Sequence, residues 1–190
     1  MEPLGKIYKE AEATGDFVRL PAGGYICRIT AVENVADKKY LWVIYDVATG
    51  EFKGLYSDEW SKAHPYAHRF VKSYKQTGDA DKDKKIMGAF KAFLRAVDES
   101  NNTHFEDEAE TGMNEKELVG KLLGLVIGYE EYETDRGEIR ERTNVRQIKN
   151  VDAIKDGKFK VPELQKLKAK DGTTAPVQGF APLNDADIPF

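Results

Sequence analysis

Residues 38–56 read KKYLWVIYDVATGEFKGLY, and this stretch decides the fold. Side chains alternate between the two faces of a strand, so every second residue shares a face. One face is apolar and is assigned to the core: Leu41, Val43, Tyr45 and Val47. Tyr40, Trp42 and Ile44 are left on the other face. The pair Thr49-Gly50 predicts a turn, with a further strand over residues 51–56.

Other segments supply the remaining elements. LPAGGYICRITAV (20–32) predicts an earlier strand, with one face carrying Tyr25, Cys27, Ile29 and Ala31. KIMGAFKAFLRAV (85–97) predicts a helix with an apolar stripe at helical spacing: Ile86, Phe90, Phe93, Leu94 and Val97. ESNN (99–102) ends that helix, and a short acidic helix or turn is expected over residues 114–118. GKLLGLVIGYEEYE (120–133) opens a long hairpin that turns at Asp135-Arg136-Gly137.

The predicted fold class is mainly β. Five strands with one main helix between strands 3 and 4 fit a five-stranded OB-fold-like barrel, although a β-sandwich or an α+β meander has the same periodicity. We expect an N-terminal arm over residues 1–17, an OB-fold-like domain over 18–168, and a flexible linker over 169–183. The linker is poor in large apolar residues, so disorder is expected there. Residues 184–190 form an acidic, hydrophobic tip.

Composition favours a cytoplasmic protein. The N-terminal residues lack an apolar signal-peptide core, no apolar run approaches a membrane span, and Cys27 has no second cysteine to pair with. The net charge of −4 conceals segregation: residues 53–95 carry 10 basic and 5 acidic groups, and residues 136–168 also carry 10 and 5. Residues 96–135 carry 2 basic and 12 acidic groups. Two basic blocks can form a basic face, or simply solvated surface.

Signatures of catalysis are weak. The sequence has no P-loop, zinc-protease or serine-hydrolase motif. His64 and His68 have the spacing of helical metal ligands, but no third ligand is evident and Pro65 lies between them. The acidic run 104–110 is most simply solvated surface. We therefore expect no enzyme activity, no metal and no cofactor.

Signatures of single-stranded nucleic-acid binding are stronger. Such proteins combine basic groups for phosphates with aromatic rings that stack on bases. Residues 38–75 interleave the two kinds, Tyr66 and Phe70 among them, and the late hairpin adds arginines on one strand face. The selected DNA-binding candidates are Lys39, Tyr40, Trp42, Lys53, Tyr56, Trp60, Arg69, Lys72, Tyr74, Arg140, Arg142 and Arg146. The alternative for any one of these aromatics is burial in the core. No helix has a clustered basic face for the major groove of a duplex.

The last residues, NDADIPF, predict a docking peptide. Phe190 can enter an apolar pocket, Pro189 stiffens the peptide, and Asp185 and Asp187 can meet basic groups on a partner. Asp185, Asp187, Ile188, Pro189 and Phe190 resemble the C-terminal tip of bacterial single-stranded DNA-binding proteins (SSBs). That resemblance implies docking of replication, recombination and repair proteins. Asn184 and Ala186 depart from the more acidic pattern of the family.

The body is similar to SSB-like proteins of phages, prophages and mobile elements of Gram-positive bacteria. The likeness covers about residues 18–162 and rests on LPAGGYICRITAVE, YLWVIYDVATGEFKG, HRFVKSYK, FKAFLRAVDESN and ELVGKLLGLVIGYEEYE. It implies a single OB-fold that coats single-stranded DNA, and it leaves a homo-oligomer open. Two rivals remain: an interaction protein that uses the tip to recruit or decoy host proteins without binding DNA, and a recombination accessory that anneals strands or loads a recombinase.

Overall fold

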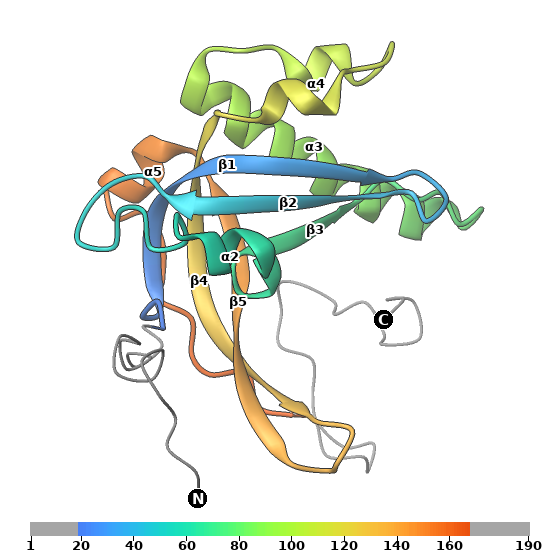
Figure 1. The fold of residues 1–190 in the computed structure, drawn as a ribbon. Coiled ribbons are helices and arrows are strands. Elements are labelled where there is room, and N and C mark those ends of the chain that lie inside the picture. Colours follow the sequence, from blue (N-terminus) through green and yellow to red (C-terminus); the bar gives the residue numbers. More distant parts are fainter. Residues whose placement is uncertain (1–18, 168–190) are drawn as a thin grey trace, which may run out of the picture.

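Five antiparallel strands form one sheet in the computed structural model, which describes residues 19–167. The strands are β1 (Gly23–Val35), β2 (Tyr40–Val47), β3 (Arg69–Ser73), β4 (Leu122–Glu133) and β5 (Ile139–Lys149), in the order β3-β2-β1-β4-β5 (Figure 1). The main helix, α3 (Ala80–Asn101), lies between β3 and β4 in the chain. The mainly-β class, the strand number and the place of the helix are therefore confirmed. The expected arm, linker and tip lie outside the described residues.

Short helical segments occupy the connections: α2 (Glu59–Ala63), η1 (Pro65–Ala67), α4 (Phe105–Glu108), η2 (Glu115–Leu118) and α5 (Val151–Lys155). The turn expected over 114–118 is η2, and the hairpin turn between β4 and β5 is also confirmed. Among residues 19–167, no helix combines the length and the apolar character that a membrane crossing requires.

The core forms between the sheet and α3. Leu41, Val43, Tyr45 and Val47 are buried, as their alternation predicts. The helix adds Phe93, Leu94 and Val97, and β4 adds Leu123, Leu125 and Ile127. The Asp79 side chain caps the first turn of α3, and Asn102 ends the helix in the left-handed conformation, with φ 55°. The helix expected from the apolar stripe is thus present and longer than that stripe.

The strand expected over residues 51–56 is wrong. That stretch is a series of turns, because Gly50 and Gly54 both take positive φ values of 84° and 75°. The Asp46 carboxylate accepts the Tyr56 backbone N–H and pins the loop back onto the end of β2. The third strand is instead Arg69–Ser73, which pairs with residues 40–44 of β2.

One face assignment in β1 is also wrong. A bulge between Ile29 and Ala31 inserts an extra residue, so Val32, rather than Ala31, lies opposite Val43. Cys27 and Ile29, before the bulge, are fully buried as expected.

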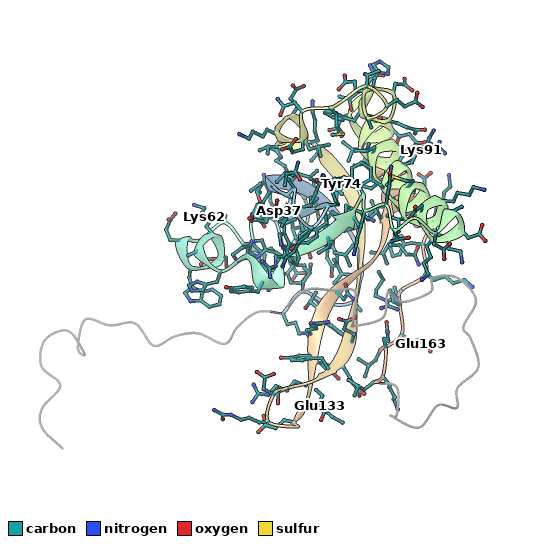
Figure 2. All side chains as sticks on the ribbon, turned by 90° about the vertical axis from the view of Figure 1, so that its right-hand side faces the viewer. Asp37, Lys62, Tyr74, Lys91, Glu133 and Glu163 are labelled. Atoms are coloured by element: carbon teal, nitrogen blue, oxygen red, sulfur yellow. The ribbon has the colours of Figure 1, made fainter. Side chains whose placement is uncertain are left out.

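The β4–β5 hairpin extends well beyond the rest of the sheet (Figure 1). Both of its faces are held near the base. On one, the Tyr129 hydroxyl donates to the Leu20 carbonyl oxygen, at 2.9 Å. On the other, Pro162 packs over Gly128. Gln165 forms a parallel bridge with Glu130 along the edge of β4, beyond the point where β1 ends its pairing. Figure 2 shows Glu133 at the far end of the hairpin, away from Lys91 on α3.

Helix α5 packs against a glycine in β4, which yields a first prediction. A Cβ at Gly124 would meet the Ile154 side chain and lie 2.8 Å from the Asn150 carbonyl oxygen. Gly124→Ala should therefore lower the free energy of unfolding by roughly 1–3 kcal/mol, measured by urea denaturation. Gly88→Ala is the control, because its Cβ would meet nothing within 4 Å and alanine favours the α3 helix. Equal stability of the two variants would contradict the close packing of α5 on β4.

Candidate nucleic-acid interface

The outer face of β2 carries two aromatic rings. Because Leu41 and Val43 point into the core, Tyr40 and Trp42 point away from it. Their rings meet edge to face, with centroids 5.6 Å apart. Trp42 lies opposite Val71 of β3, and Ile44 lies opposite Arg69. The outer sides of β2 and β3 therefore form one surface.

Arg69 joins this surface to a third ring. Its guanidinium carbon lies 3.9 Å from the centroid of Trp42 and 4.8 Å from the centroid of Tyr66. Tyr66 belongs to η1 and is 71% exposed. We call Tyr40, Trp42, Tyr66 and Arg69 the aromatic face. Three of the four are selected candidates, and the structure brings them together.

Trp60 is also exposed, at 59%, but in a different setting. It lies on α2, and its ring stacks on His64 with centroids 4.8 Å apart. The Nδ1 atom of His64 is 2.9 Å from the Trp60 carbonyl oxygen. His68 is buried, and burial lowers the pKa of its imidazole. The two histidines thus have separate packing roles in the described structure.

Tyr56 is a core residue, and its selection as a base-stacking candidate is wrong. It is only 6% exposed, and its ring stacks on the buried His68 with centroids 4.4 Å apart. Burial raises the pKa of its phenol to about 12. A ring covered in this way offers no face to a base.

Lys72 lies on the opposite side of β3 from Arg69. Its amine is 6.0 Å from the ring centroid of Phe70 and 5.9 Å from that of Phe93, which places it toward the core and α3. Burial lowers the pKa of this ammonium from 10.5 to about 8. The residue is thus not part of the aromatic face.

The remaining candidates of residues 38–75 lie around the sheet. Tyr74 is half-buried, and its hydroxyl donates to Asn34 Oδ1 at 2.6 Å while its ring meets Phe90. Lys39 precedes Tyr40 in the β1–β2 turn with φ 57°. Lys53 is exposed in the loop that follows the other end of β2.

The hairpin arginines are engaged with carboxylates. Arg140 pairs with Glu138 at 2.7 Å, and Arg142 pairs with Glu130 at 2.5 Å. Arg146 donates to the Gln165 side chain and lies 3.9 Å from Glu130. The three therefore share one side of the hairpin, as their spacing predicts, but anions already neutralise part of their charge.

The two basic regions do not form one stripe. In the sheet order, β1 and β4 separate β2 from β5. The groove expected from arginines lying beside the Tyr40–Trp42 strand is therefore not formed by neighbouring strands. Tyr66 is not among the selected candidates, because its sequence signal is only its place among interleaved basic and aromatic residues.

The sequence matches no protein-family model, and no curated protein matches it significantly. A proposal for the function therefore rests on the geometry of the aromatic face and on the sequence.

Lys72 yields a prediction about stability and pH. Its lowered pKa means that the unfolded chain holds a proton that the folded chain lacks between about pH 8 and 10.5, so the free energy of unfolding rises with pH there. Lys72→Met should stabilise the fold by roughly 1–3 kcal/mol at pH 7, and the gain should fade toward pH 10.5. Urea denaturation at both pH values measures this.

The control for this prediction is Lys53→Met, at an exposed position. It should change the free energy of unfolding by no more than about 0.5 kcal/mol at either pH. A Lys72→Met protein that is less stable than the unchanged chain at pH 7 would show that burial does not disfavour the charged amine.

Proposed function

We propose that the protein binds single-stranded DNA with little sequence preference and recruits replication, recombination and repair proteins through its C-terminal tip. The observation that carries the first half is the contact of the Arg69 guanidinium with Trp42 and Tyr66. It places a cation and two aromatic rings on one side of a sheet. These are the two groups that a single strand requires, for phosphates and for bases.

The same surface favours single strands over duplexes. Stacking on a side chain needs a base with an open π-face, which paired and stacked bases in a duplex lack. Reading a duplex requires an element that enters a groove. The aromatic face instead lies on strands β2 and β3 and on the short η1 turn.

A partly open OB-fold barrel is the architecture that we propose for this body. The five strands and the helix between β3 and β4 support it. Closure would bring β3 and β5 together, and the ladders among residues 19–167 do not include that pair. OB-folds bind oligonucleotides over strands 2 and 3, where the aromatic face lies.

The tip supports the recruiting role by its chemistry. A partner that holds Phe190 in an apolar pocket can pair basic groups with Asp185 and Asp187. A flexible connection would raise the local concentration of partners at the bound strand. In this proposal the protein acts in the cytoplasm, has no enzyme activity and needs no metal or cofactor.

One observation favours the rival interaction protein. Glu130 already pairs with Arg142 and lies near Arg146. Its negative charge weakens the electrostatic attraction between the hairpin and phosphate groups. If the aromatic face also fails to hold a strand, the body is only a carrier for the tip.

Trp42→Ala tests the proposal directly. Each base stack is worth about 1–3 kcal/mol, so the affinity for labelled oligo(dT) should fall by about 5- to 150-fold. Fluorescence anisotropy measures this without relying on tryptophan emission. Tyr56→Phe is the matched control, since its buried ring should leave the affinity unchanged. Unaltered binding by Trp42→Ala would exclude the aromatic face, and no binding by the unchanged chain would favour the interaction protein.

The tip has its own test. Phe190→Ala should leave the oligo(dT) affinity unchanged and abolish binding to a purified bacterial replication or repair protein that recognises SSB tips. Asn184→Ala, which alters a position outside the matching residues, should bind that protein normally. Binding that survives Phe190→Ala would contradict the docking role of the tip.

A further inference from the structure

Arg69 contacts two rings of the aromatic face at once. Its guanidinium is in contact range of Trp42 and of Tyr66, whereas within residues 19–167 these two rings form no ring pair with each other. The arginine thus bridges two rings that do not stack on one another. A guanidinium and a nucleobase are both flat groups that stack on aromatic faces.

These two rings differ in freedom. Trp42 lies within β2, and its ring meets that of Tyr40 edge to face. Tyr66 lies on the three-residue η1 turn, and most of its surface is exposed. Trp42 is therefore the more confined ring, and Tyr66 has more room to change its position.

The donors of Arg69 are not committed to an anion. Within residues 19–167 the Arg69 guanidinium has no carboxylate partner and donates no hydrogen bond, whereas Arg142 donates to Glu130. In this part of the chain its contacts are with the two rings. A contact of this kind at an exposed site is weak compared with base stacking.

We propose that the space between Trp42 and Tyr66 is a subsite for one unpaired nucleobase, which Arg69 fills in the free protein. The incoming base takes the place of the guanidinium between the rings. The released guanidinium then pairs with a phosphate of the same strand, which it can contact with several donors at once. This subsite rests on the proposed function, because it is a part of the single-strand surface.

The exchange leaves a signature in the salt dependence. Without Arg69, binding loses one phosphate contact, so the slope of log affinity against log salt becomes shallower by about 0.7. The base also no longer has to displace a cation. Near 500 mM salt, where phosphate contacts contribute least, Arg69→Ala should therefore bind about two- to fivefold tighter than the unchanged chain. Near about 50 mM salt this advantage should disappear.

The experiment is an anisotropy titration of labelled oligo(dT) from about 50 mM to about 500 mM NaCl. It uses the full chain and its Arg69→Ala, Arg69→Gln and Arg136→Ala variants. Arg69→Gln keeps a flat neutral group and should lie between Arg69→Ala and the unchanged chain. Arg136→Ala removes one positive charge at the hairpin turn between β4 and β5. It does not vacate the space beside Trp42 and Tyr66, so this variant should not bind tighter than the unchanged chain at any salt concentration.

A second measurement needs no variant of Arg69. In the free chain the NMR resonance of its Nε–H group should carry a ring-current shift that Trp42→Ala removes. Saturation with oligo(dT) should return the resonance toward its ordinary position. An unmoved resonance at saturation, or an Arg69→Ala variant that binds more weakly at every salt concentration, would overturn the subsite and leave the proposed function standing. Failure of the unchanged chain to bind oligo(dT) would overturn both.

Discussion

The two-sided character of β2 is the constraint on which the rest of the structure depends. Leu41, Val43 and Tyr45 are buried, and moving the strand by one residue would bring Tyr40 and Trp42 into the core in their place. The cost of such a slip fixes the pairing of β2 with β1 and with β3. The outward position of Trp42 is therefore not set by any interaction of its own. It follows from the burial of its neighbours, so the stability of the core also maintains the aromatic face.

Alternation and helical spacing made the regular elements predictable. The β2 faces, the α3 stripe and the late hairpin follow from patterns within one segment. The wrong prediction of a strand over residues 51–56 has a different cause. The residue types there are typical of a strand, but Gly50 and Gly54 take positive φ values and turn the chain. The bulge after Ile29 likewise depends on how β1 fits two neighbours at once. Local sequence does not contain that information.

The site was harder to predict, since aromatic residues serve both core and surface. In β2 the period of two separated Tyr45 from Trp42 correctly. In the irregular stretch between β2 and β3 no period exists, so Tyr56 and Tyr66 looked alike although one is buried and the other exposed. Lys72 shows the same problem for charge, because its position on the core side depends on where β3 begins.

The partners of the arginines separate the two basic regions of the protein more clearly than charge counts do. Arg142 already contacts the carboxylate of Glu130, so binding a phosphate exchanges one anion for another. Glu130 would then stay largely buried without this cation, which costs free energy. Among residues 19–167 the Arg69 guanidinium contacts aromatic rings and no carboxylate, so a phosphate adds an ionic partner that these residues do not supply. The net gain is therefore larger at Arg69, although the hairpin carries more arginines. For this reason we propose the aromatic face, rather than the most basic segment of the chain, as the surface for a single strand.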